Sequence, residues 1–237
     1  MGLRIHVLQH VPFEGPAAIA DWAAYHGHSL SATHLFVPNS TLPAIEQIDV
    51  LVVMGGPMGV HDVAEYSWLQ GELDFVRKVL ESGKKVLGVC LGAQILAYVL
   101  GAAVTRNAER EIGWFPVTRT SNLSPKLCTL LPASFPAFHW HGETFALPAG
   151  AVALGSSAAC AQQGFIWNTQ ALALQFHLET TPASAEALLV NGTSDLQGGG
   201  AFVQSPEQIR QGARENETAL HRIMGQLLDA WLTLSGN

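Results

Sequence analysis

The chain has 237 residues, of which 48% are hydrophobic and 13% charged, with 23 Gly, 12 Pro and a formal net charge of −7. This length and apolar content are enough to bury a substantial core and exclude an intrinsically disordered chain. Glycine shows no triplet period and only 3 cysteines are present, which excludes collagen-like and disulfide-scaffold classes. With 19 acidic against 12 basic residues, the charge balance argues against a nucleic-acid partner.

The cysteines also indicate a cellular compartment. Cys90, Cys128 and Cys160 lie far apart and form no Cys-x-x-Cys pair, and such a sparse, odd set is typical of a reducing environment. The apolar run at the N-terminus is too short for a signal peptide. No window approaches about 18 uninterrupted apolar residues, although the mean hydropathy is +0.21. We therefore expect a cytoplasmic protein with no membrane partner.

In chain order, short apolar runs alternate with amphipathic segments through the first 100 residues. Strands are predicted at Leu3–Leu8, Ser31–Val37, Asp49–Met54 and Lys85–Val89. The last two are continuous apolar runs of the kind found in buried parallel strands. The segments with apolar residues at helical spacing are predicted as helices, at Ala17–His26, Glu65–Glu81 and Ala93–Leu100. This alternation favours right-handed β-α-β units on a parallel sheet.

From Ile112 to Phe176 the pattern changes to short strand candidates separated by turns. We expect these tracts to form a largely antiparallel extension of the same sheet, within a single domain of residues 1–237; they read GWFPVTR, PAFHWH, ETFAL, AVALGS and ALALQFH. A Gly-rich loop over 192–205 and a long helix over 206–234 are predicted as appended elements. The apolar stripe of that helix is expected to dock on the main body, and partner binding by the stripe stays open.

The tract Gly88-Val89-Cys90-Leu91-Gly92 joins a predicted buried strand to a predicted helix. Flanking glycines allow a sharp turn without Cβ clashes, and the residue at its apex is held out at the carboxyl edge of the sheet. A cysteine there lies at the positive end of a helix dipole, which favours the nucleophilic thiolate. From the spacing alone, a small buried cysteine explains the tract equally well; Cys128 and Cys160 lack such a setting.

A thiolate nucleophile needs a base, and the base needs a group that orients it. His177 and Glu179 follow the apolar run Ala171–Leu174, and residues i and i+2 of an extended segment face the same side. The two side chains are therefore expected to meet, with Glu179 fixing the tautomer of His177.

Two further tracts carry candidate chemistry. His139 and His141 also alternate, which would place two imidazoles on one face of a strand, as in some metal sites. No further cluster of ligand residues has compatible spacing, so we predict no metal and expect these residues to line or buttress a pocket. Gly55-Gly56-Pro57 ends a strand in a loop with exposed amides, and the amides of Gly56 and Leu91 could serve an oxyanion. Neither a Walker tract nor Gly-x-Gly-x-x-Gly is present, and no cofactor is predicted.

These motifs, in this order, resemble the class I glutamine amidotransferase domain. That family has a Gly-Gly-Pro loop, a Gly-x-Cys-x-Gly-x-Gln elbow and a late His-x-Glu, which stand here at Gly55–Pro57, Gly88–Gln94 and His177–Glu179. The tract Phe138–Glu143 (FHWHGE), followed by Leu147–Gly150, is similar to its GMP-synthetase-like branch. The resemblance covers residues 49–180 firmly and implies a flavodoxin-like doubly wound sheet.

The resemblance also implies roles for individual residues. Cys90 would attack the γ-carboxamide of glutamine, His177 would relay protons, and Glu179 would orient His177. The amides of Gly56 and Leu91 would hold the oxyanion. The residues implied to bind the substrate are Gln94, Trp140, His141 and Gly142.

The chain departs from the family pattern in carrying Leu178 where proline is usual and Glu143 where aspartate is commoner, and neither change removes a catalytic atom. About 57 residues follow Thr180, so the ammonia acceptor would be a separate synthetase subunit, or the protein would be a free-standing hydrolase of glutamine or of another γ-glutamyl compound. The sequence does not separate these two.

Two other classes compete with this interpretation. An α/β-hydrolase has a similar elbow, but its chain order is nucleophile, acid, histidine, whereas here the acid follows the histidine. A non-catalytic regulatory or interaction subunit would retain the elbow without using it. Unreactive Cys90 would favour that second class.

Overall fold

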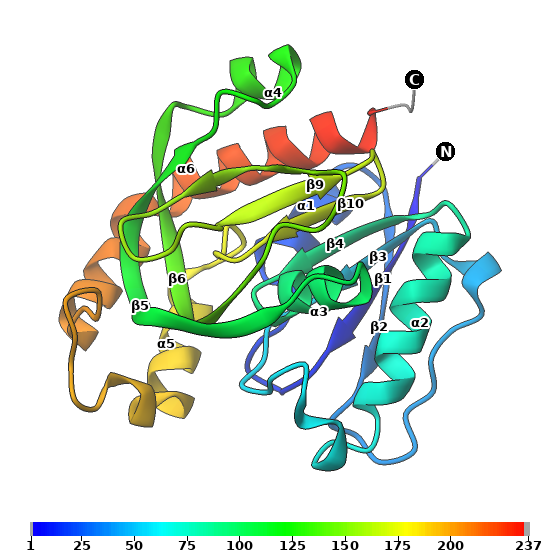
Figure 1. Ribbon diagram of the computed structural model, residues 1–237, viewed down its shortest axis with the longest axis horizontal. Helices are drawn as coiled ribbons and strands as arrows, with labels where there is room; N and C mark the ends of the chain where they lie inside the picture. Colours follow the sequence, from blue (N-terminus) through cyan, green and yellow to red (C-terminus); the bar gives the residue numbers. More distant parts are fainter. Residues whose placement is uncertain (1, 235–237) are drawn as a thin grey trace.

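A computed structural model describes residues 2–234 (Figure 1). Its main sheet has seven strands in the order β2-β1-β3-β4-β10-β9-β7. The strands are β1 (Arg4–Gln9), β2 (Ser29–His34), β3 (Val50–Val53), β4 (Lys85–Val89), β7 (Ala151–Ala153), β9 (Gly164–Trp167) and β10 (Ala171–Leu174). Strands β2, β1, β3, β4 and β10 are parallel, and β9 and β7 continue the sheet with antiparallel pairing.

Helices cover both faces of this sheet. Side chains of β3 alternate between two cores: Val50 and Val52 pack in the core that holds α1 (Ala18–Tyr25) and α6 (Pro206–Leu232). Leu51 and Val53 pack in the other, with α2 (Leu69–Glu81) and α3 (Leu91–Val99). A strand buried on both faces reads as a continuous apolar run, which is why Asp49–Met54 has no polar alternation. The predicted doubly wound α/β architecture is confirmed.

A second, separate sheet lies beside the first, with strand order β6-β5-β8. It consists of β5 (Val104–Arg119), β6 (Ser134–Phe145) and β8 (Gly155–Ser156). The predicted antiparallel extension of the main sheet is present as β9 and β7, the latter from the AVALGS tract. The prediction is wrong for the tracts that form β5 and β6, because these strands pair with each other along their length and bury Val117 and Phe135 in the core beneath α6. PAFHWH and ETFAL, expected as two strands, are one strand, β6. Alternating hydropathy marks a half-buried strand without specifying its neighbour.

Strand β10 is also placed differently from the prediction. It was expected within the antiparallel tracts, and it does pair antiparallel with β9. On its other side, however, it pairs in parallel with β4, with Leu174 opposite Val89. Hydrophobic periodicity carries no information on strand direction, so this had to come from the fold. The consequence is that the carboxyl ends of β4 and β10 lie next to each other, and with them Cys90 and His177.

The remaining differences are local. Helix α2 begins at Leu69 rather than Glu65, since the preceding residues form separate turns around Asp62. The predicted start of the long helix at Pro206 is confirmed, with Ser205 and Gln208 forming a capping box. Helices that the sequence analysis did not predict are α4 (Pro125–Leu130) and α5 (Pro182–Asn191), with 3-10 turns at Ile45–Gln47, Asp62–Ala64 and Thr193–Leu196. In residues 2–234 no helix is both long and apolar enough to cross a membrane.

Candidate active site

Cys90 occupies a strained turn between β4 and α3. Its backbone has φ 53° and ψ −108°, a conformation that residues other than glycine seldom adopt. A Cβ at Gly88 would run into the carbonyl of Gly92, and a Cβ at Gly92 would run into the carbonyl of Val53. The two glycines are therefore required by close backbone approach, and the sequence pattern Gly-x-Cys-x-Gly is the signature of this elbow.

His177 lies beyond the end of β10, where its position is set by the second sheet. Its amide donates to the carbonyl of Phe138 in β6 at 2.8 Å. The ring Nδ1 and Glu179 Oε1 are 2.6 Å apart, as the spacing of the two residues predicts. The Glu179 carbonyl in turn accepts from the amide of Ala18 at the start of α1, at 3.2 Å. Both side chains are almost fully buried, 4% and 7% exposed.

The charge on this pair follows from its surroundings. Burial by itself lowers the pKa of His177, but the Glu179 carboxylate and the neighbouring Cys90 thiol outweigh it and raise that pKa well above the usual value. The ring Nε2 has no hydrogen-bond partner within residues 2–234. A Cβ built on Gly55 would lie 3.4 Å from His177 Cε1 and 3.5 Å from Cys90 Cβ, so both side chains flank this glycine. An imidazolium with a free Nε2 beside a cysteine can stabilise a thiolate and exchange protons with a bound group.

The loop after β3 is held by a buried ion pair that the sequence analysis missed. His10 Nδ1 donates to the carbonyl of Gly55 at 2.9 Å, and its Nε2 lies 2.8 Å from Glu72 Oε1. Burial lowers the pKa of His10, but the Glu72 carboxylate outweighs it and raises the pKa. Both ring nitrogens of His10 are therefore N–H donors. The bond to Glu72 holds the ring, and the ring in turn holds the Gly55 peptide through its carbonyl. Outside the helices and strands of residues 2–234, no backbone hydrogen bond is donated by the amide of Gly56 or of Leu91.

A pocket of about 490 Å³ opens over the elbow. Of the residues predicted for the site, those that line it are Gly56, Cys90, Gln94, Trp140, His141 and Gly142. His177 and Glu179 line a small adjoining cavity that shares Phe13 and Glu14 with the main pocket. The fold thus brings nearly all of the predicted residues together. Leu91 does not line the pocket, but its side chain contacts the loop that does: Leu91 Cδ2 would lie 3.2 Å from a Cβ built on Gly56.

Gln94, which was predicted to bind the substrate, is linked to the Cys90 thiol through Gln175, which was not predicted. Gln94 Nε2 donates to Gln175 Oε1 at 3.3 Å, and Gln175 Nε2 donates toward Cys90 Sγ at 3.8 Å. The thiol itself donates to the carbonyl of Trp140 at 3.6 Å. Gln175 stands two residues before His177, and that proximity was the available sequence signal.

The Gly-rich segment also belongs to the pocket, although it was predicted only as an appended loop. Arg110 donates to the carbonyls of Asp195, Gln197 and Gly199 at 2.6, 2.8 and 3.2 Å. The Asp195 carboxylate accepts from Trp140 Nε1 at 2.9 Å. The segment is therefore fastened across one wall of the pocket. No local pattern could reveal this, because Arg110 lies about 85 residues earlier in the chain.

Glu14, which follows β1, is a further carboxylate in the pocket wall. Burial raises its pKa, and the nearby His177 acts in the opposite direction. A Cβ at Gly55 would clash with its Oε2. Glu14 had no motif to mark it in the sequence.

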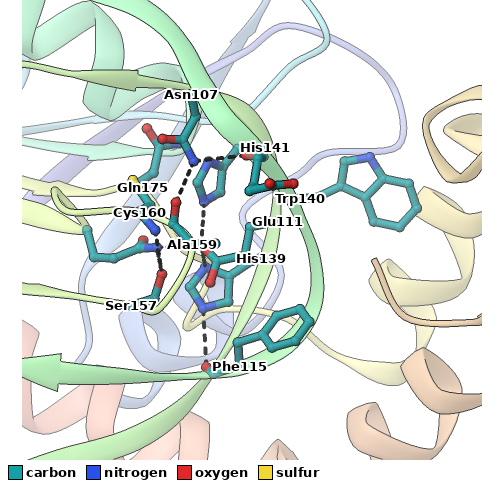
Figure 2. A network of polar contacts seen from close by, with 12 residues as sticks. Asn107, Glu111, Phe115, His139, Trp140, His141, Ser157, Ala159, Cys160 and Gln175 are labelled. Atoms are coloured by element: carbon teal, nitrogen blue, oxygen red, sulfur yellow. Dashed lines mark hydrogen bonds and ion pairs between the residues drawn. The ribbon is translucent and has the colours of Figure 1, made fainter. Parts of the chain in front are cut away.

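His139 and His141 lie on one face of β6, as their spacing predicts, with ring centroids 5.8 Å apart. Only His141 lines the pocket; His139 is fully buried behind it, and burial lowers its pKa to about 3. Glu111 of β5 lies directly opposite His141 in the sheet register and turns toward both rings (Figure 2).

Together, the fold and the pocket define a doubly wound α/β protein with a cysteine elbow and a His–Glu pair at the carboxyl edge of its sheet. Residues 18–194 match the family model described as glutamine amidotransferase class-I. The chain therefore belongs to the class I glutamine amidotransferase family.

Individual relatives support this assignment. The glutamine amidotransferase-like protein YfeJ of Salmonella typhimurium is 28% identical over 88% of this chain and 90% of its own length. A glutamine amidotransferase structure from Thermotoga maritima superposes with a TM-score of 0.88 at 28% identity, covering 99% of this chain and 100% of that one. Another from Methylobacillus flagellatus gives 0.90 at 26% identity, covering 100% and 97%.

A longer relative matches only in part. The glutamine-hydrolysing GMP synthase of Thermomicrobium roseum is 33% identical over 70% of this chain, but that match spans only 30% of the synthase.

Proposed function

We propose that the chain hydrolyses the γ-amide of glutamine through a γ-glutamyl thioester on Cys90, releasing ammonia and glutamate. The observation that carries the proposal is the convergence of a strained cysteine, a buried His177–Glu179 pair and a pocket of about 490 Å³ in a member of this family.

In the first half-reaction, the Cys90 thiolate attacks the γ-carbonyl carbon and the oxyanion is bound by the amides of Gly56 and Leu91. His177, protonated at Nε2, gives that proton to the leaving nitrogen as the C–N bond breaks, and ammonia departs. Glu179 holds the ring by its Nδ1 in the productive orientation.

In the second half-reaction, water attacks the thioester carbon. His177 Nε2 takes a proton from the water, the C–S bond breaks, and glutamate leaves with the Cys90 thiolate restored. Gln94, through Gln175, and the pocket residues Trp140, His141 and Gly142 would position the substrate.

Two fates of the ammonia fit the family: release into solvent, or transfer to a synthetase on a separate subunit. The matches to the longer GMP synthases favour the subunit, since those enzymes join an equivalent segment to a longer chain. YfeJ and the Thermotoga maritima protein match this chain over at least 90% of their own lengths, which supports a second candidate, a free-standing hydrolase. Its substrate would be glutamine or another γ-glutamyl compound.

The test measures ammonia and glutamate release from glutamine, beside cleavage of a γ-glutamyl dipeptide, for the wild type, Cys90→Ala and the control Cys128→Ala. We expect Cys90→Ala to lose more than about 10³-fold in turnover, whereas Cys128→Ala keeps it, because Cys128 lies outside the pocket. Preference for the dipeptide would select the second candidate. If neither substrate turns over and a glutamine-analogue electrophile leaves Cys90 unlabelled, the proposal is wrong and a non-catalytic subunit takes its place.

A further inference from the structure

Glu111, His139 and His141 form a cluster at the pocket wall. His141 lines the pocket, whereas Glu111 and His139 lie behind it and have no part in the proposed mechanism. One donor atom from each residue lies within 4.8 Å of the other two. The three side chains are 0%, 0% and 1% exposed. Such a set of buried, ionisable groups needs a partner that balances their charges and lone pairs.

The hydrogen bonds of the two rings determine which nitrogen carries the proton. His139 Nε2 lies 3.2 Å from the carbonyl of Phe115, and His141 Nδ1 lies 3.0 Å from the carbonyl of Glu143. A carbonyl can only accept, so each of these nitrogens is an N–H donor. In a neutral imidazole the other nitrogen then presents a lone pair. Those nitrogens are His139 Nδ1 and His141 Nε2.

Both lone pairs face one carboxylate oxygen (Figure 2). Glu111 Oε2 lies 3.4 Å from His139 Nδ1 and 3.1 Å from His141 Nε2. Among residues 2–234, His139 Nδ1 has no hydrogen-bond partner, and neither has the second carboxylate oxygen, Glu111 Oε1. Gln163 Nε2 donates to Glu111 Oε2 at 2.6 Å, so this oxygen has one donor already. The two imidazole lone pairs still face the carboxylate, and a cation between the three groups would turn that repulsion into attraction.

We propose that Glu111, His139 and His141 bind one divalent transition-metal ion of the zinc type. Ligands about 2.0–2.1 Å from a tetrahedral ion are separated from each other by about 3.3 Å, which matches the 3.1 and 3.4 Å observed. Two imidazoles and a carboxylate are a ligand set that zinc takes. Backbone carbonyls that orient each ring through its other N–H are the usual outer support of such ligands.

The position of the cluster assigns the ion a structural role. It joins β5 to β6 immediately behind Trp140, whose carbonyl contacts the Cys90 thiol. Because Glu111 and His139 are fully buried and only His141 borders the pocket, the ion would support the pocket wall rather than bind substrate. The ion would hold the pocket wall in register, and this inference stands independently of the proposed function.

The test uses the full chain, stripped with a chelator and titrated with Zn²⁺ or Co²⁺, with metal content measured after dialysis. We expect one ion per chain and a visible Co²⁺ spectrum without a thiolate charge-transfer band, since no sulfur belongs to the ligand set. His139→Leu should weaken binding by more than about 100-fold, because even outer-shell changes cost 10–100-fold.

Two control variants separate this cluster from other metal-binding groups. Cys90→Ser removes the reactive thiol, and the double variant His26→Ala/His28→Ala removes a pair of stacked imidazoles near the surface, 5.8 Å apart. Both should bind as the wild type does. Three outcomes would overturn the proposed metal site: a thiolate band in the Co²⁺ spectrum, loss of binding in either control variant, or the absence of a stoichiometric ion in the wild type. Glu111, His139 and His141 would then be a buried hydrogen-bonded cluster. Should His139→Leu fail to fold, the wild-type Co²⁺ spectrum still decides between these outcomes.

Discussion

Replacing Glu179 with glutamine tests the electrostatic account of the candidate active site. The substitution keeps the shape of the side chain but removes the charge that lies 2.6 Å from His177 Nδ1. Because both side chains are at most 7% exposed, solvent does not compensate for the loss. A hydrogen bond to a charged group contributes about 1.5–3 kcal/mol, and we take about 2 kcal/mol as the expected loss in the free energy of unfolding near pH 6.

The pH dependence of this loss has a defined sign. The folded-state pKa of His177 is raised above the unfolded value of about 6.5. Its contribution to stability is therefore fully present below about pH 6.5 and is lost as the pH rises through the folded pKa. In Glu179→Gln, burial without a compensating charge should leave His177 neutral. The difference between the two proteins should accordingly be largest near pH 6 and narrow on the alkaline side.

Urea unfolding of wild type and Glu179→Gln between pH 5.5 and 9 measures this difference directly. Glutamine hydrolysis, if the proposed function holds, should fall by about 10²–10⁴-fold in the same variant, because the base loses its orientation and charge. Equal stability of the two proteins at pH 6, or a difference that grows with pH, would refute the imidazolium–carboxylate pair. The unfolding measurement does not depend on the catalytic proposal.

Three further substitutions test the supports of the site. Gly92→Ala should lower the free energy of unfolding by about 1–3 kcal/mol, because the new Cβ would meet the carbonyl of Val53 in β3. The control is Gly71→Ala on α2, where a Cβ would meet no other atom. This variant should be more stable than the wild type by about 0.5–1 kcal/mol. Glu72→Gln should lower the free energy of unfolding by about 3–5 kcal/mol near pH 6, because it leaves the buried imidazolium of His10 without its carboxylate partner. This loss should become smaller as the pH rises through the raised pKa of His10. Arg110→Ala should speed hydrogen exchange of the Gly-rich segment by about tenfold, because three backbone carbonyls lose their donor.

Each of these has an outcome that contradicts its reasoning. Equal effects of the two alanine substitutions would mean that close approach at the elbow is unimportant. A pH-independent cost for Glu72→Gln would show that His10 is neutral in the wild type. Unchanged exchange in Arg110→Ala would mean that other contacts hold the segment in place.

Most strands of the main sheet and the elbow followed from local sequence, whereas strand β9 was not predicted. A continuous apolar run predicts a buried strand because both of its faces must leave water, and Lys85–Val89 is found with the predicted bounds. The glycines around Cys90 are required by backbone contacts within one turn, so their spacing is visible without the fold. His177 and Glu179 meet as their two-residue spacing predicts, although the chain bends there instead of continuing as a strand.

What the sequence did not determine was which strands become neighbours. Periodicity specifies the face that a residue occupies but neither the partner nor the direction of its strand, so β10 and the separate β5–β6 sheet were misplaced. The third member of the histidine cluster, Glu111, is about 30 residues from His141 and was invisible to spacing. His10 and Arg110 reach the site over still longer separations. The reactive residues Cys90, His177 and Glu179 are thus visible in short sequence motifs. The charged residues that support them, such as His10 and Arg110, are brought to the site by strand pairing and burial, which only the tertiary structure establishes.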